Sequence, residues 1–263
     1  MSLEKDRFRS TAARAFFALT ALSVLVGVTL ELWLSYHSRT ILPPHAGFTR
    51  TFGPGLDGAM NQLVFFTTES NIILGLTTLL LAIRLNRSSE VFHVFRLVGL
   101  IDVAITAVVY NVLLAGDVKP EGLGQVANVI QHMINPSLGW IGWLAFGPAR
   151  LITVRRVALA ALLPLAWGVG TLVRGALIDW YPYSILDVPR LGYGGVALYI
   201  LAVLALFLVI AGVLAVIDRR LGAWPFRAGE LAISDRRAEP LPASRQESRR
   251  STSGGARHIS GVT

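Results

Sequence analysis

Long apolar stretches alternate with short polar connections along this chain. A helix that crosses a bilayer needs roughly 20 mainly apolar residues. The stretches that reach this length are about 15–36, 60–84, 94–115, 126–147, 154–177 and 194–217. The sequence has no run of short alternating strands, and only helices or closed barrels satisfy their backbone polar groups in lipid. The pattern therefore predicts an all-α fold, a polytopic bundle of six transmembrane helices.

Composition supports a membrane protein and excludes several other classes. The 263 residues are 53% hydrophobic and 15% charged, with a mean hydropathy of +0.57, which is too apolar for an ordinary soluble domain. The net charge of +8 could indicate nucleic-acid binding. The basic residues, however, lie in short runs between apolar blocks and near the C-terminus. The topology of a membrane protein explains this distribution better than nucleic-acid binding does. The chain has no cysteine, which excludes disulfides, thiolate metal sites and thiol catalysis.

Lys and Arg are distributed unevenly between the two sets of connections. The set that includes both termini holds nineteen of the 24, so both termini are expected in the cytoplasm. The first apolar stretch is long enough to span, and we interpret it as an uncleaved helix rather than a secretory signal. The expected parts are a cytoplasmic segment 1–14, a six-helix transmembrane domain 15–218 and a basic, disordered cytoplasmic tail 219–263.

The connection between the first two apolar stretches is rich in turn-forming residues, namely Pro43, Pro44, Gly53, Pro54 and Gly55. It is long enough to cover the outer mouth of the bundle. It is therefore either a lid or a simple connector.

A run of five polar residues, 67–71, interrupts the second apolar stretch. An ionisable residue at membrane depth is costly, so it usually faces the bundle interior and makes a functional-site hypothesis. Polar residues at helical spacing mark one face of other stretches as well, whereas the last stretch, 194–217, is almost entirely apolar and is expected at the periphery. The polar residues expected to line a pocket in the outer half are Glu31, Glu69, Asn71, Asp102, Tyr110, Asn111, Asn128, Asn135 and Arg174.

Thr67, Thr68 and His132 are the candidate catalytic residues. A hydroxyl becomes a useful nucleophile when a neutral imidazole within hydrogen-bond reach takes its proton, and His132 is the only histidine expected in the outer half of the bundle. One threonine as nucleophile and His132 as base would make an acyl-transfer site, with neighbouring Asn or Tyr side chains as oxyanion donors. Successive helical residues are offset by about 100°, so both threonines cannot point at one atom, and the choice stays open.

Two other interpretations stay open. The carboxylates could neutralise Arg174 and His132 in a non-catalytic membrane scaffold, or Glu69 could carry a proton in a small-solute transporter. No metal-ligand spacing is present. For haem, His93 is expected at the cytoplasmic end and His132 in the outer half, so they do not form a facing pair, and we expect no metal and no cofactor. The expected partners are membrane lipid and a lipid-like or amphipathic small molecule, without nucleic acid; the sequence identifies no protein partner.

The order of several motifs resembles the bacterial Pr-six-Pr membrane proteins. The motifs that carry the resemblance are Phe66-Thr67-Thr68-Glu69-Ser70-Asn71, Val109-Tyr110-Asn111, Gln131-His132-Met133-Ile134-Asn135-Pro136, Arg174-Gly175-Ala176, Trp180-Tyr181-Pro182-Tyr183, Leu186-Asp187 and Gly192-Tyr193-Gly194-Gly195. They span the second to the sixth predicted helix, and the Trp-Tyr-Pro-Tyr and Gly-Tyr-Gly-Gly segments are the most specific. The resemblance implies a multi-pass protein of a bacterial plasma membrane.

More distantly, the pattern is similar to the androgen-induced and androgen-dependent-TFPI-regulating proteins. These are multi-pass hydrolases of fatty acid esters of hydroxy fatty acids that use an intramembrane threonine and histidine. The resemblance assigns the threonine to Thr67 or Thr68 and the histidine to His132, while Glu69 departs from the usual apolar residue. It implies that this chain hydrolyses a fatty-acyl or lipid-like ester.

Overall fold

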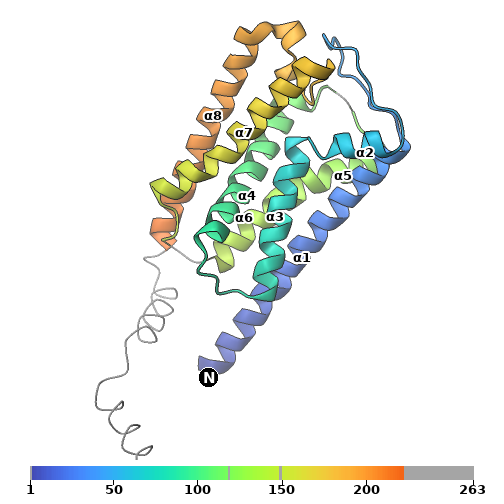
Figure 1. Cartoon of the computed structure of the whole chain (residues 1–263). Helices are drawn as coiled ribbons and strands as arrows, with labels where there is room; N and C mark the ends of the chain where they lie inside the picture. Colours follow the sequence, from blue (N-terminus) through green and yellow to red (C-terminus); the bar gives the residue numbers. More distant parts are fainter. Residues whose placement is uncertain (1, 118, 148–149, 222–263) are drawn as a thin grey trace, which may run out of the picture. The chain divides into compact units, whose positions relative to one another are not determined.

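The computed structural model describes residues 2–117, 119–147 and 150–221. The described part is all-helical and contains no strand, so the expected all-α fold class is confirmed (Figure 1). The chain divides into two compact units, Met1–Arg219 and Arg220–Thr263. Apart from the last two residues of the final helix, all described elements belong to the first unit. Most of the expected tail, 219–263, lies outside the described residues.

The first unit contains helices of very different lengths. In chain order these are α1 (Ser2–His37), α2 (Leu56–Gln62), α3 (Phe66–Ile83), α4 (Glu90–Val109), α5 (Leu123–Val129), α6 (Asn135–Phe146), α7 (Val154–Ile178) and α8 (Val188–Leu221). Two π-helical turns, η1 (Tyr110–Leu114) and η2 (Ile130–Ile134), extend α4 and join α5 to α6. A short 3-10 turn, η3 (Ser184–Leu186), lies between α7 and α8.

Among the described residues, five helices are long and apolar enough to cross a membrane. They are Phe8–His37, Phe66–Ile83, Glu90–Leu114, Val154–Ile178 and Val188–Leu221. Large apolar side chains on α7 and α8 are exposed, including Leu162, Val169, Val173, Leu177, Leu198, Leu201, Val209 and Val216. Apolar surface of this extent indicates a membrane-embedded protein. The sixth expected span, 126–147, corresponds to the consecutive segments α5, η2 and α6, none of which reaches spanning length alone.

The second expected helix, 60–84, is broken into α2 and α3. Phe65 has extended backbone angles, φ −73° and ψ 133°, and α3 begins at the next residue. The Trp167 indole Nε1 of α7 donates to the Val64 carbonyl at 3.0 Å, which satisfies a backbone group freed by the break. Thr67 therefore lies in the first turn of α3, where backbone N–H groups have no acceptor within the helix, and not in the middle of a span.

Helix α3 packs against α1 and α4 through small residues at close approaches. A Cβ on Gly75 of α3 would lie 2.7 Å from Val24 of α1. Gly99 of α4 and Gly139 of α6 both face Leu74, which is fully buried. Glycine lets helix backbones approach closely, as is typical of helix packing in membranes. These contacts hold the first turn of α3 in a fixed position relative to α4 and α6.

Charged contacts gather at the end of the unit where α1 begins and α8 ends (Figure 1). Arg156 forms a salt bridge with Glu90 at 2.8 Å. Asp218 of α8 accepts a hydrogen bond from the Ile152 backbone N–H at 2.9 Å, and Arg14 donates to the Ile83 carbonyl. The loops expected on the cytoplasmic side thus lie together with the start of α1, although the orientation in a membrane stays a prediction.

At the other end, the loop of residues 38–55 is tied to the connection between α7 and α8. The Asp187 carboxylate accepts a hydrogen bond from the Gly47 backbone N–H at 2.7 Å. The Asp179 carboxylate accepts from both the backbone N–H and the hydroxyl of Thr49, at 3.1 and 3.0 Å. We call residues 38–55 together with 179–187 the cap. The loop is more than a simple connector, because buried Asp187 depends on it for a hydrogen bond.

The contact of Gly175 in α7 with the cap gives a stability prediction. A Cβ on Gly175 would overlap the Tyr181 ring, so Gly175→Ala must displace that ring. We expect the substitution to destabilise the protein by about 1–3 kcal/mol, as overpacking usually does. A lowered melting temperature of the purified protein in detergent would report this loss.

Gly170→Ala, on the same helix, is the matched control, because a Cβ there meets nothing within 4 Å. It should leave the melting temperature unchanged or raise it slightly, since alanine is the better helix former. Equal melting temperatures for the two variants would contradict the cap packing.

Candidate functional site

The structure brings Thr67 and His132 together. The Thr67 hydroxyl Oγ1 lies 3.4 Å from the imidazole Nε2 of His132. Thr68 lies on another side of α3, where its hydroxyl accepts a hydrogen bond from the Gln62 side-chain amide at 3.3 Å. Of the two threonines that the sequence left open, Thr67 is therefore the one whose hydroxyl faces the imidazole, and the hydroxyl of Thr68 does not.

The tautomer of His132 follows from its second nitrogen. Nδ1 lies 3.1 Å from the Asn128 backbone carbonyl, which can only accept, so Nδ1 carries the hydrogen. In the neutral ring, Nε2 then has a free lone pair directed at the Thr67 hydroxyl. An imidazole oriented in this way can take a proton from a hydroxyl, and hydrogen bonds of this kind are often long before a substrate binds.

Both π-helical turns contribute to the pair. His132 lies within η2, and Tyr110, the first residue of η1, stacks on its ring with centroids 3.9 Å apart and an interplanar angle of 28°. A π-helical turn shifts the side chains that follow it relative to a regular helix, and such turns often occur at functional sites. Stacking restricts rotation of the imidazole and keeps Nε2 directed at Thr67.

The start of α3 is capped by Tyr183, which follows the Trp-Tyr-Pro segment of the cap. The Tyr183 hydroxyl accepts a hydrogen bond from the Thr67 backbone N–H at 3.1 Å and lies 3.3 Å from Thr67 Oγ1. Its ring packs edge-on against Phe65, with centroids 5.6 Å apart. Burial raises the pKa of Tyr183 to about 12, so the phenol keeps its proton at neutral pH.

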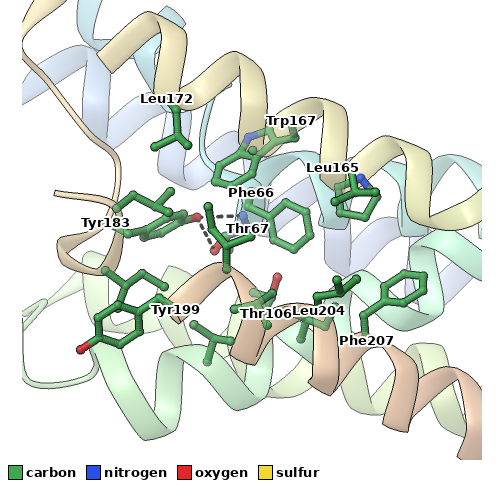
Figure 2. Close-up of a pocket in the computed structure, with 18 of the residues that line it drawn as sticks. Phe66, Thr67, Thr106, Leu165, Trp167, Leu172, Tyr183, Tyr199, Leu204 and Phe207 are labelled. Carbon is green, nitrogen blue, oxygen red and sulfur yellow. Dashed lines mark hydrogen bonds between the residues drawn. The ribbon is translucent and has the colours of Figure 1, made fainter. Parts of the chain in front are cut away.

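A cavity of about 190 Å³ opens beside Thr67 (Figure 2). Its walls come from the start of α3 and from α4, η1, the cap, α7 and α8. In Figure 2, Thr67 lies between Tyr183 on one side and Phe207 on the other. The lining between them is mainly aliphatic and aromatic, including Ile105, Leu165, Leu172, Val203, Leu204 and Phe207. An apolar cavity with a few hydroxyl groups in its lining is suited to an amphipathic molecule.

Helix α8 was expected at the periphery, and most of its large apolar side chains are indeed exposed, but one side of the helix also forms part of the cavity wall. The residues that α8 contributes to the cavity wall are Tyr199, Ile200, Val203, Leu204 and Phe207. The sequence of this helix is apolar all round, so the side facing the cavity cannot be distinguished from the side facing lipid.

Asn71 and Asn135 join α3, α6 and α1 through a buried amide network. The Asn71 amide donates to the Thr67 carbonyl at 2.8 Å and accepts from the Asn135 amide at 2.7 Å. Ser23 of α1 donates to the Asn135 side chain, also at 2.7 Å. Both asparagines are completely buried. They support the backbone of Thr67 from behind and do not line the cavity.

Three other expected pocket residues have local roles. The Asn111 amide donates to the Ala107 carbonyl of its own helix, and Asn128 contributes its backbone carbonyl to His132. Arg174 donates to the Asn61 side chain at 2.8 Å, and its guanidinium lies over Trp180 of the cap. Arg174 thus contacts an amide and aromatic rings, and in the described part of the chain it forms no salt bridge with a carboxylate.

The three carboxylates expected in the pocket do not line the cavity. Glu31 and Glu69 are half-buried on α1 and α3. Asp102 on α4 is completely buried, and within the described part of the chain neither of its oxygens has a hydrogen-bond partner. The prediction that these polar groups converge in one pocket is therefore wrong for the three carboxylates.

Sequence analysis did not single out Tyr183 or Trp167 as site residues. Tyr183 follows a proline in the most specific motif, but nothing in the sequence indicates that it reaches Thr67, 116 positions earlier. Trp167 lies on an apolar helix, and its contact with Val64 depends on a helix break that no Pro or Gly marks.

In the part of the chain that the structure describes, no group of three or more His, Asp or Glu side chains is placed to hold a metal ion. Comparisons of the chain with protein-family models, with curated proteins and with solved structures gave no match.

Asn71 and Asp102 allow a paired stability test. Asn71→Leu removes the acceptor of Asn135 and leaves buried amide groups unpaired, which should cost about 1–3 kcal/mol. Asp102→Leu removes a buried carboxyl without a hydrogen-bond partner, so it should leave stability unchanged or raise it. Melting temperatures in detergent would compare them, and a large loss for Asp102→Leu would mean that Asp102 has a stabilising partner.

Proposed function

We propose that this protein is an integral membrane ester hydrolase in which Thr67 is the nucleophile and His132 the general base. The observation that carries the proposal is the 3.4 Å approach of Thr67 Oγ1 to His132 Nε2, with Nδ1 fixed by the Asn128 carbonyl. A hydroxyl, a base and a group that orients the base form the arrangement used for nucleophilic acyl transfer.

In the first step, Thr67 Oγ1 attacks the carbonyl carbon of a bound ester while its proton passes to His132 Nε2. The carbonyl oxygen becomes an oxyanion. The positive end of the α3 dipole favours this charge, because Thr67 lies in the first turn of the helix. The intermediate then expels the alcohol oxygen, which takes the proton from His132 and leaves the acyl group on Thr67.

In the second step, water attacks the acyl-threonine ester. His132 Nε2 accepts a proton from the water as the new C–O bond forms, and it returns that proton to Thr67 as the acid leaves. The products are an alcohol and a carboxylic acid. The cycle restores the Thr67 hydroxyl and a neutral His132.

The cavity supports a substrate with a hydrocarbon chain. An apolar cavity of about 150 Å³ holds a benzene molecule, so about 190 Å³ accommodates a hydrocarbon segment on the order of six to eight carbons. Helices α7 and α8 form two of its walls, and their other faces expose large apolar side chains. A fatty-acyl or lipid-like ester would therefore reach Thr67 from the surrounding lipid.

The resemblance to the androgen-induced and androgen-dependent-TFPI-regulating hydrolases supports the same chemistry, whereas the resemblance to the Pr-six-Pr proteins supports a multi-pass membrane protein alone. The former resemblance assigns the nucleophile to one of two threonines, and the geometry favours Thr67. The transporter interpretation receives less support, because Glu31, Glu69 and Asp102 do not line the cavity. A bacterial plasma membrane and two cytoplasmic termini are parts of the same proposal.

Hydrolysis of p-nitrophenyl octanoate by the purified protein in liposomes tests the proposal. Thr67→Val keeps the shape of the side chain and removes the hydroxyl, so it should lower the rate at least about 100-fold. His132→Ala should lower it by about 10²–10⁴-fold, the usual contribution of a general base.

Thr68→Val is the matched control, because the Thr68 hydroxyl contacts Gln62 and not His132. It should keep the wild-type rate within about threefold. The assignment would be wrong if Thr67→Val kept the wild-type rate, or if Thr68→Val lost activity while Thr67→Val did not.

A further inference from the structure

The Tyr183 hydroxyl contacts the proposed nucleophile, yet proton transfer between Thr67 and His132 does not use it. It lies 3.3 Å from Thr67 Oγ1, and both residues line the cavity (Figure 2). The helix break before α3 and the 3-10 turn of the cap bring it there from a position far along the chain. Its place beside a reacting atom calls for a chemical explanation in addition to its role as a helix cap.

We infer that Tyr183 is a third catalytic residue, the hydrogen-bond donor to the oxyanion that forms when Thr67 attacks an acyl ester. This inference rests on the proposed function, because it assigns a further group to the same reaction.

The hydrogen bonds of Tyr183 leave its proton available for donation. The Thr67 backbone N–H donates to the phenol oxygen, so that oxygen is an acceptor there and its own hydrogen points elsewhere. In the free site the hydrogen can be donated to Thr67 Oγ1, whose own hydrogen is directed at His132. The hydrogen bond from the Thr67 backbone N–H to the phenol oxygen polarises the O–H bond.

The position of Tyr183 also suits the tetrahedral intermediate. The oxyanion and Thr67 Oγ1 are then bonded to the same carbon atom. A donor 3.3 Å from Oγ1 needs only a short movement to reach an oxyanion at about 2.7–3.1 Å, the distance at which such donors are effective. No proton is transferred: the phenol stays protonated and exchanges one acceptor, Oγ1, for another. Its pKa of about 12 agrees with this role.

Tyr183→Phe tests the inference, because it removes only the hydroxyl. Removing one oxyanion donor usually lowers kcat by about 10²–10³-fold, and we expect that loss with KM for p-nitrophenyl octanoate within about threefold of wild type. The affinity for an alkylboronic acid, which forms a tetrahedral anion on a hydroxyl nucleophile, should fall in parallel. The affinity for octanoic acid, which binds without forming that adduct, should not change.

Tyr181→Phe is the matched control. Tyr181 belongs to the same segment, but it does not line the cavity and its hydroxyl makes no hydrogen bond to Thr67. It should keep the wild-type kcat. Tyr183→Met is a second variant without a donor, in case Tyr183→Phe loses its thermal transition.

The outcomes separate the two proposals. If the wild-type protein hydrolyses no ester, or hydrolyses it no faster than the Thr67→Val variant, the proposed function fails. The role of Tyr183 then fails with it. If hydrolysis depends on Thr67 but folded Tyr183→Phe keeps kcat within threefold, only the role of Tyr183 is overturned. A lowered melting temperature with unchanged kcat would make Tyr183 a helix cap alone.

Discussion

The break before α3 is the feature on which the site depends. A helix that begins inside an apolar bundle exposes backbone N–H groups in its first turn, and each needs a partner. Tyr183 supplies a partner for Thr67, and the break itself is held by the indole of Trp167 on the Val64 carbonyl. Satisfying these groups brings a phenol from the cap to Thr67, the proposed nucleophile, and an indole from α7 to the helix break beside it. The constraint that stabilises the helix end also assembles one side of the site.

The side of the site that holds His132 depends on close helix packing and on two π-helical turns that interrupt the regular helices. Glycines at the contacts of Leu74 let α4 and α6 approach α3 closely, and the buried amides of Asn71 and Asn135 fix the axial position of α3. The π-helical turns then place Tyr110 against His132 in a stack. The proposed base, His132, is thus held by backbone geometry and ring contacts, without a carboxylate, while Thr67 and Tyr110 line the apolar cavity.

Sequence analysis predicted the all-helical fold and the Thr/His pair, because both depend on patterns that are local in the chain or on a stated resemblance. It could not choose between Thr67 and Thr68, since that choice depends on where α3 begins, and no Pro or Gly marks the position. It grouped Glu31, Glu69 and Asp102 with the cavity, because the spacing of polar residues indicates which face of a helix they lie on and how deep they lie in the membrane. The spacing does not indicate which other helix packs against that face. The roles of Tyr183 and α8 required the tertiary arrangement.

The central claim, that Thr67 is a nucleophile activated by His132, is tested most directly by identifying the residue that a fluorophosphonate modifies. The protein in liposomes would be treated with an alkyl fluorophosphonate, digested and analysed by tandem mass spectrometry. We predict one adduct, on the Thr67 hydroxyl, that is formed by the wild-type protein and is lost in His132→Ala. An adduct on Thr68 or on another residue, or an adduct on Thr67 that forms equally fast without His132, would contradict the claim.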